Sequence, residues 1–312
     1  MCPALSEQDF SMPRSRPSRR ARAVAVTAGV LLTALGAAAP ALAVTGVYPS
    51  GGGRHGSTAV GGERVVCTSG TPGLAPTLSR DIADAFRGRA DTQALALYDA
   101  STRTSCRFRA DDAFDSASVV KVTVLGALLR QAQEAHRPLT AEEGRLATAM
   151  ITKSDNAATN ALWRQVGPDG IRHFLTLAKM AHTEPGDGPA WGLTQITADD
   201  QLTLMRLLTH DNDVLGPGAR AYALGLMRHV APDQRWGAPA GHPADATSQV
   251  KNGWLPRTTD GWRVHSVAAF TGGGHDYGLA VLSRANRTMD YGVATIEAAS
   301  RVIHRDLDAA SG

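Results

Sequence analysis

The sequence Ser118-Val119-Val120-Lys121 opens a run at residues 118–129 (SVVKVTVLGALL) that most constrains the fold. Its apolar side chains recur at α-helical spacing, which predicts a helix with one buried stripe. A serine and a lysine three positions apart share a helix face, about 5–6 Å apart at Cβ. An uncharged lysine amine can take the proton of a serine hydroxyl, so Ser118 and Lys121 are a candidate nucleophile and base. For the tetrapeptide alone, a helix-capping serine with a solvated lysine is the simpler interpretation.

A second motif, Ser154-Asp155-Asn156, precedes another predicted helix. All three residue types cap helices well, and capping alone would explain them. In a functional interpretation, Ser154 relays a proton to a leaving group and Asn156 binds a substrate amide, while Asp155 is structural.

A third motif, Lys251-Asn252-Gly253, is predicted at the end of a strand. Lys251 can pair with a substrate carboxylate, and Gly253 allows a close approach between the strand edge and the ligand. The main-chain N–H groups of Ser118 and Trp254 would then stabilise an oxyanion. An ordinary Asn-Gly hairpin turn is the alternative. We also expect the Trp254 side chain in the substrate pocket, although core packing would explain it about as well.

In this order the motifs resemble those of class A β-lactamases and related penicillin-binding acyl-serine enzymes. The resemblance runs from about Ala94 to the terminal helix and includes the residues at 114–117 and 197–200. It implies an α/β fold in which helices flank an antiparallel sheet and an all-α domain is inserted. It also implies attack on a β-lactam or an acyl-D-alanyl-D-alanine peptide, without a metal or cofactor. The implied roles are acylated nucleophile for Ser118, base or relay for Lys121, proton shuttle for Ser154, substrate ligand for Asn156 and carboxylate anchor for Lys251.

Two positions depart from the family pattern. Asn252 stands where the family usually has threonine or serine, so recognition of the substrate carboxylate could shift. Class A enzymes also carry a loop glutamate that activates the water for deacylation, but the segment 182–196 is short and Glu184 is its only glutamate. We treat Glu184 as a candidate deacylation base, with a solvated loop carboxylate as the alternative. Without such a base, hydrolysis of the acyl-enzyme would be slow.

The domain organisation follows from composition and periodicity. Residues 1–43 read as a cleavable signal peptide, with five arginines before an apolar run, although a retained anchor is the alternative. We expect a flexible tether at 44–66, a sheet-bearing domain from 67–117 and 237–312, and a helical domain at 118–236. Strands are predicted at 92–99, 101–109, 248–251, 262–271 and 277–284, and helices at 141–150, 157–166, 169–180, 198–210, 219–228 and 289–306.

Charge and cysteines limit the partners and the compartment. Without the signal peptide, which holds five of the 32 basic and two of the 29 acidic residues, the chain is neutral and offers no reason to bind nucleic acid. We expect a secreted monomer that is not inserted in a membrane after signal removal and acts on a small molecule or a peptide. In an oxidising compartment Cys67 and Cys106 could form a disulfide, with two free thiols as the alternative.

Three other functional classes are alternatives to a serine hydrolase of this family. A binding or sensing protein could keep this scaffold and acylate slowly or not at all. An esterase of another fold is disfavoured because no G-x-S-x-G elbow occurs, and a zinc enzyme because no H-E-x-x-H pair occurs.

Overall fold

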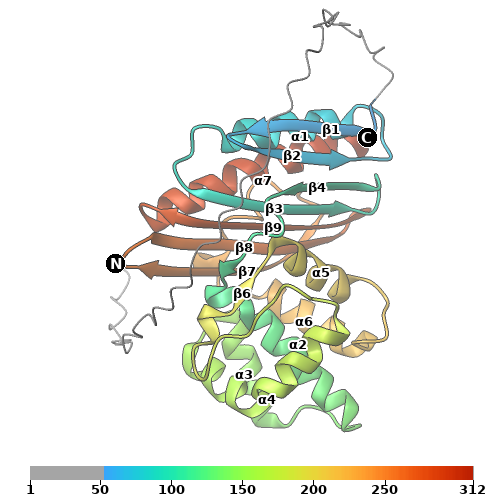
Figure 1. Ribbon diagram of the computed structural model, residues 1–312. Coiled ribbons are helices and arrows are strands. Elements are labelled where there is room, and N and C mark those ends of the chain that lie inside the picture. The colour runs from blue at the N-terminus through green and yellow to red at the C-terminus, as the bar shows by residue number, and fades with distance from the viewer. Residues whose placement is uncertain (1–52, 312) are drawn as a thin grey trace, which may run out of the picture. The chain divides into compact units, whose positions relative to one another are not determined.

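An antiparallel sheet built from both ends of the chain organises residues 53–311, the part that this computed structural model describes (Figure 1). Its strand order is β1-β2-β4-β3-β9-β8-β7, so β3 from the amino-terminal half pairs with β9 from the carboxy-terminal half. This confirms the expectation that strands bracket a block of helices. The strands are β1 (His55–Val60), β2 (Glu63–Thr68), β3 (Thr92–Asp99), β4 (Thr104–Phe108), β7 (Thr247–Arg257), β8 (Gly261–Gly272) and β9 (His275–Asn286).

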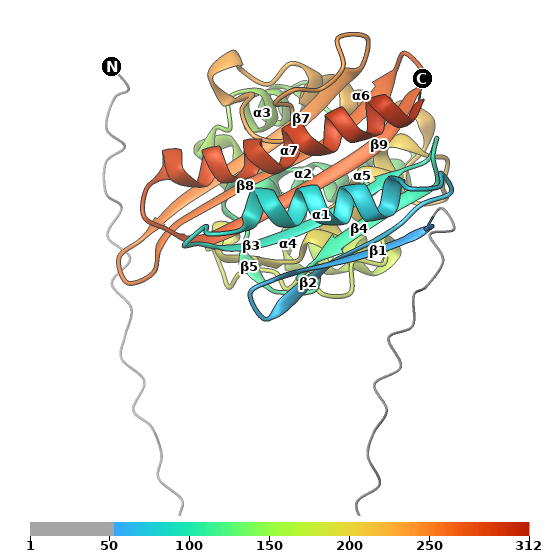
Figure 2. The ribbon, with the colours of Figure 1, turned by 90° about the horizontal axis from the view of Figure 1, so that it is seen from above.

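Two helices cover one face of the sheet, α1 (Leu74–Phe86) and α7 (Met289–Ser311), which lie side by side in Figure 2. In α1 the residues Leu74, Leu78, Ile82 and Phe86 repeat every four positions and are all buried. Such spacing places them on one stripe of the helix, so burial against the sheet stabilises the helix. On the other face, α5 (Ala198–Thr209) packs against β3, β8 and β9, although we predicted it within the helical domain.

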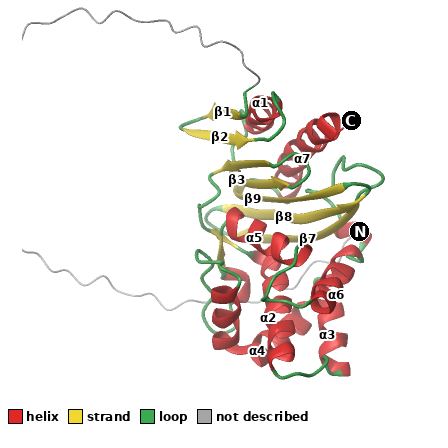
Figure 3. Ribbon diagram, turned by 90° about the vertical axis from the view of Figure 1, so that its right-hand side faces the viewer, coloured by secondary structure: helices red, strands yellow, loops and turns green. Residues whose placement is uncertain are grey.

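The remaining long helices gather below α5, on the side of the sheet away from α1 and α7 (Figure 3). They are α2 (Val120–Glu134), α3 (Ala141–Thr152), α4 (Asn156–Leu177) and α6 (Pro217–Arg228). Helices α2 and α4 pack closely at Gly126, where an added Cβ would lie 2.4 Å from the ring of Phe174. The element α4 holds two helical segments, which meet at Gly167, where the backbone is not helical (φ 72°, ψ 163°), so the two helices predicted at 157–166 and 169–180 are confirmed.

The short elements near the sheet edge are β5 (Phe114–Asp115) paired with β6 (Gln195–Ile196), and the single-turn 3₁₀ helices η1 (Ala117–Val119), η2 (Trp191–Leu193) and η3 (Pro232–Gln234). Ser118 lies in η1, which leads directly into α2.

The predicted tether requires a correction. Its residues 55–66 belong to strands β1 and β2, whereas its first part and the predicted signal peptide lie outside the described residues. These strands were not predicted because few of their side chains are both apolar and buried. Val65 and Cys67 are among those few. Tertiary contacts hold the hairpin instead: Gly56 packs tightly on the main chain of α1, and a disulfide joins Cys67 to Cys106 of β4, as expected. Helix α1 was not predicted either.

Candidate active site

Ser118 lies in η1, one turn before α2, at the seam between the sheet and the helices. Its side chain is partly exposed, and the residue before it, Ala117, has a φ of 47°. This left-handed conformation is unfavourable for alanine, so the surrounding packing must hold it. Strained backbone of this kind is typical of residues beside functional groups.

The segment that leads to Ser118 is anchored at Asp115. The carboxylate accepts hydrogen bonds from Arg263 (3.2 Å) and Gln195 (2.8 Å). The main-chain oxygen of Asp115 lies 2.8 Å from Nε2 of the buried His265. Because Nδ1 of His265 accepts from the N–H of Ser283, Nε2 is the protonated nitrogen and donates to Asp115. Burial lowers the pKa of His265 to about 4, which matches this neutral form.

Lys121 is wholly buried on the first turn of α2. Its Nζ lies 2.6 Å from the main-chain oxygen of Ser154, 3.0 Å from Ser154 Oγ and 2.8 Å from Asn156 Oδ1. Burial and the charge of Lys251 lower its pKa to about 6. The amine is therefore largely uncharged at neutral pH, with two N–H groups for the carbonyl oxygens and a lone pair to accept a proton.

Lys251 approaches the same hydroxyl from β7. Its Nζ lies 3.1 Å from Ser154 Oγ and 2.9 Å from the main-chain oxygen of Asn252. Burial lowers its pKa to about 7. Two amines thus flank Ser154 Oγ, and protons can move between them through this hydroxyl. Asp155 caps α4 by accepting from the N–H of Ala158, as predicted.

Gly253 lies directly against the nucleophile segment. A Cβ on Gly253 would be 2.8 Å from the main-chain nitrogen of Ser118, 2.9 Å from that of Val119 and 3.0 Å from the carbonyl oxygen of Ser116. No side chain fits there, so the glycine allows β7 and η1 to meet. The third motif lies inside strand β7, which continues to Arg257, and therefore forms neither the predicted strand end nor an Asn-Gly turn.

The direction of the Trp254 N–H follows from the pairing of β7 with β8. In an antiparallel ladder, residues alternate between those whose N–H and C=O both face the partner strand and those whose groups face away. The carbonyls of Ser248 and Asn252 accept from the side chains of Arg235 and Lys251, outside the ladder. Trp254 belongs to the same alternate set, so its N–H faces the free edge of β7, next to Gly253.

Asn252, a predicted substrate-binding residue, has its side chain buried against the loop before β7. Side chains alternate along a strand, so Asn252 lies opposite Lys251 and Gly253. It is wholly buried, and its Nδ2 donates to the main-chain oxygens of Gln234 (2.9 Å) and Trp236 (2.8 Å). The side chain therefore fixes the loop before β7. Trp254 shares this face, and its ring packs on Trp236 at 6.1 Å between centroids, so only its main chain is placed to meet a substrate at Gly253.

The hydrogen-bonded cluster of Lys121, Ser154 and Lys251 does not include Glu184. Glu184 is exposed, and its main chain pairs with Gln195 through N–H to oxygen bonds of 2.9 and 2.8 Å. Among residues 53–311, the contacts recorded for Glu184 are those of its main chain. The same loop instead presents Trp191 to Lys121, with Nζ 4.8 Å from the ring centroid. Our sequence reasoning missed Trp191 because it searched this loop for a carboxylate.

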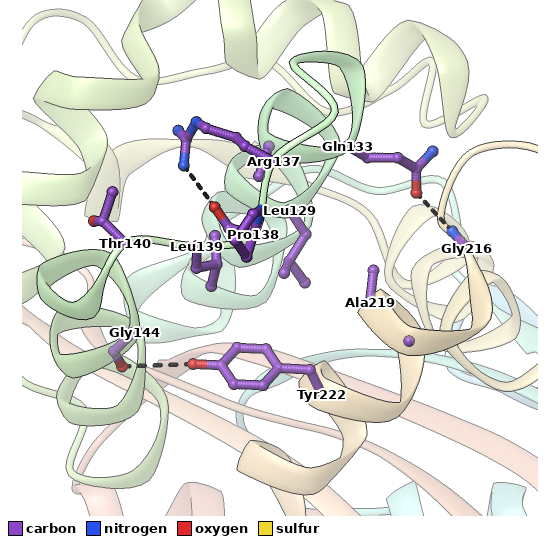
Figure 4. Close-up of a pocket in the computed structure, with 12 residues that line it drawn as sticks. Leu129, Gln133, Arg137, Pro138, Leu139, Thr140, Gly144, Gly216, Ala219 and Tyr222 are labelled. Carbon is purple, nitrogen blue, oxygen red and sulfur yellow. Dashed lines mark hydrogen bonds between the residues drawn. The ribbon is translucent and has the colours of Figure 1, made fainter.

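A separate hollow of about 660 Å³ lies among α2, α3 and α6 (Figure 4). Leu129, Leu139 and Tyr222 contribute to its mostly apolar wall. It touches the carboxy-terminal half of α2 and shares no residue with the Ser118 site. In the part of the chain with described structure, no three His, Cys, Asp or Glu side chains are arranged to hold a metal ion.

A partly exposed serine one turn before a buried lysine whose pKa is lowered to about 6, on this α/β fold, defines a serine hydrolase. A sequence model described as the Beta-lactamase enzyme family matches residues 77–144 and 140–307. The chain therefore belongs to the beta-lactamase enzyme family. A comparison with curated proteins finds no match.

Solved structures share the fold at low sequence identity. A mutant of PBP-A, described as an acyl-enzyme complex with penicillin G, is 20% identical with a TM-score of 0.65, covering 75% of this chain and 96% of that one. A class A beta-lactamase from Bacteroides cellulosilyticus is 15% identical, with a TM-score of 0.66 and coverage of 76% and 99%. A beta-lactamase from Xanthomonas campestris is 20% identical, with a TM-score of 0.63 and coverage of 75% and 98%. Among the described helices of this chain, none combines the length and the apolar character needed to cross a membrane.

Proposed function

We propose that the chain is a serine hydrolase whose Ser118 is acylated by a β-lactam or a related amide. The observation that carries this proposal is the buried amine of Lys121, whose pKa of about 6 leaves it able to accept a proton at neutral pH. A cationic lysine in water could not serve as a base under these conditions.

The reaction begins when the hydroxyl proton of Ser118 moves to Nζ of Lys121 while Oγ attacks the substrate carbonyl carbon. The resulting oxyanion accepts hydrogen bonds from the main-chain N–H groups of Ser118 and Trp254. When the carbon–nitrogen bond breaks, Ser154 Oγ gives its proton to the leaving nitrogen. Ser154 then regains a proton from Lys121, 3.0 Å away.

Lys251 favours substrates with a carboxylate near the leaving nitrogen. Its amine is buried and has an ordinary pKa only when an anion compensates its charge. A carboxylate of a β-lactam, or of the last residue of an acyl-D-alanyl-D-alanine peptide, would supply that anion and hold Lys251 protonated. Asn156 Oδ1 lies in the same cluster and would accept from the substrate amide.

Release of the acyl group is slow in this proposal, as in a penicillin-binding or sensing protein. The surroundings of Glu184 support slow release, because its exposed carboxylate makes no hydrogen bond or ion pair with Ser118, Lys121 or Ser154 within residues 53–311. Trp191 covers the amine from the side of the same loop. Activation of a water for hydrolysis of the ester would therefore depend on Lys121 and Ser154, without help from a carboxylate base.

Secretion is part of the proposal as well. The signal-like residues 1–43 motivate it, and the buried disulfide between Cys67 and Cys106 supports an oxidising compartment.

Intact-protein mass spectrometry after mixing with benzylpenicillin, followed over time, tests this function. We expect an adduct of the mass of the drug that persists for many minutes, and none in Ser118→Ala. An adduct that decays within seconds, with turnover of nitrocefin, would instead indicate an efficient β-lactamase. Labelling that survives Ser118→Ala would exclude this site assignment.

A further inference from the structure

The loop between Glu184 and Gln195 is held in place at several points. The paired main chains of these two residues close its base, and Thr194 Oγ1 accepts from the N–H of Gly186 at 3.1 Å. From α4, the indole N–H of Trp163 donates to the main-chain oxygen of Gly188 at 2.8 Å. The loop is thus a fixed part of the wall around Ser118.

This fixed loop presses η2 onto η1, the turn that holds the nucleophile. Ser116 Oγ donates to the main-chain oxygen of Trp191 at 3.3 Å, and the N–H of Thr194 donates to the same oxygen at 3.1 Å. A Cβ on Gly192 would lie 4.0 Å from the Cα of Ala117, in van der Waals contact. These contacts use the main chain of Trp191, so they would remain if its side chain were shortened.

The indole ring of Trp191 is held by a contact separate from those of its main chain. Its Nε1–H donates to Oδ1 of Asn160 on α4 at 2.7 Å, which sets the plane of the ring. The ring face then lies 4.8 Å from Nζ of Lys121. Ser154 and Asn156 occupy the polar positions around the same nitrogen, so the ring closes a side on which water would otherwise approach.

We propose that Trp191 is a positioning residue that shields the amine of Lys121 from water and thereby sets the pH range in which Ser118 can be acylated. This rests on the proposed function, since it assigns Trp191 a task in the activation of Ser118 by Lys121. The substrate need not touch the ring.

Two opposing effects act on Lys121, and the structure indicates which is larger. An aromatic face attracts an ammonium group by about 0.5–2 kcal/mol and would raise the pKa. Removal of water disfavours the charged form and lowers it. The charges that face the amine are Lys251 on β7, which lowers the pKa, and Asp155 at the start of α4, which raises it. Because burial is the largest cause of the net decrease to about 6, the removal of water dominates.

The variant that tests the proposal is Trp191→Ala, with Trp191→Phe as the conservative partner. Alanine exposes the amine and keeps the main-chain contacts, whereas phenylalanine keeps a ring but loses the bond to Asn160. As a control, Trp163→Phe removes an anchor of the same loop without uncovering Lys121. Thermal unfolding of all three establishes that they fold.

The readout is the titration of the lysine side chains by NMR with ¹³C at Cε, which is practical because the chain has four lysines. Lys121→Met identifies the resonance of Lys121. We expect the pKa of Lys121 to rise by one unit or more in Trp191→Ala and to stay near that of the parent protein in Trp191→Phe and Trp163→Phe. A rise of about 1.5 units would cut the uncharged fraction at pH 7 about fourfold. The pH dependence of acylation by benzylpenicillin should move by the same amount.

The titration does not depend on any reaction, so the two proposals fail separately. If folded Trp191→Ala titrates as the parent protein does, the role of Trp191 is refuted even if acylation slows. If its titration moves while Ser118 of the parent protein is never acylated, the role of Trp191 in shielding Lys121 is supported and the proposed function is refuted.

Discussion

The substitution Gly253→Ala probes the contact on which the site depends most directly. The new methyl carbon would lie 2.8 Å from the main-chain nitrogen of Ser118 and 2.9 Å from that of Val119. Ordinary van der Waals contact begins at 3.4 Å, so β7 and η1 would have to separate by about 0.6 Å. The clashing atoms are backbone, and no rotation of a side chain can relieve them.

The substitution should affect the stability of the protein and the rate of acylation to different extents. Overpacking of a buried contact destabilises a protein by about 1–3 kcal/mol. The same displacement moves the N–H of Ser118 away from that of Trp254, and a misplacement approaching 1 Å lowers a reaction rate by roughly tenfold to a hundredfold. We therefore expect a modest loss of stability and a much larger loss of acylation.

Urea unfolding and the second-order rate constant for acylation by benzylpenicillin measure both effects. Gly225→Ala is the matched control, because Gly225 lies inside α6 with no atom within 4 Å of an added Cβ. It should be stabilised by up to about 1 kcal/mol and acylate normally. If Gly253→Ala acylates at the parent rate, the close approach of β7 to Ser118 has no part in catalysis.

Three further changes test other parts of the structure. Lys251→Met removes a neighbouring charge that lowers the pKa of Lys121, so the acylation profile should move to higher pH; an unmoved inflection would contradict this. Burial lowers the pKa of His265 from 6.5 to about 4, so the unfolded chain binds more protons between these values. The free energy of unfolding should therefore fall, by on the order of 3 kcal/mol, as pH drops from 6.5 to 4. In His265→Gln, urea unfolding should show a smaller decrease over this pH range. An equally large decrease would exclude His265 as its source. Replacing both Cys67 and Cys106 by alanine opens a link across a sequence separation of 39 and should lower the free energy of unfolding by up to about 4 kcal/mol, whereas an unchanged urea midpoint would show that the link is dispensable.

The order of strands and helices was predictable where periodicity is strong. Helix α2 carries a continuous apolar stripe, and β8 and β9 are rich in buried apolar residues. The residue pattern of each element was therefore enough to predict its secondary structure. The hairpin of β1 and β2 was missed because its stability comes from α1 and the disulfide, which are distant in sequence.

Parts of the site were also open to prediction. Ser154 and Lys251 were expected beside Lys121, and the structure brings all three amine and hydroxyl groups together. The direction of the Asn252 side chain could also have been predicted. If strand β7 continues beyond Lys251, the alternation of side chains along a strand places Asn252 on the opposite face from Lys251. No local pattern indicated that Trp191 would face Lys121.

By itself the sequence determined the chemical groups and their local geometry: a serine and a lysine on one helical turn, a glycine small enough for a close contact, and two cysteines able to pair. Tertiary structure alone decided what those groups can do. A lysine has the same side chain on a surface and in a core, and only burial by α4, β7 and Trp191 makes the amine of Lys121 a base at neutral pH. Removal of water from a charge depends on every neighbour at once, and those neighbours come from segments far apart along the chain.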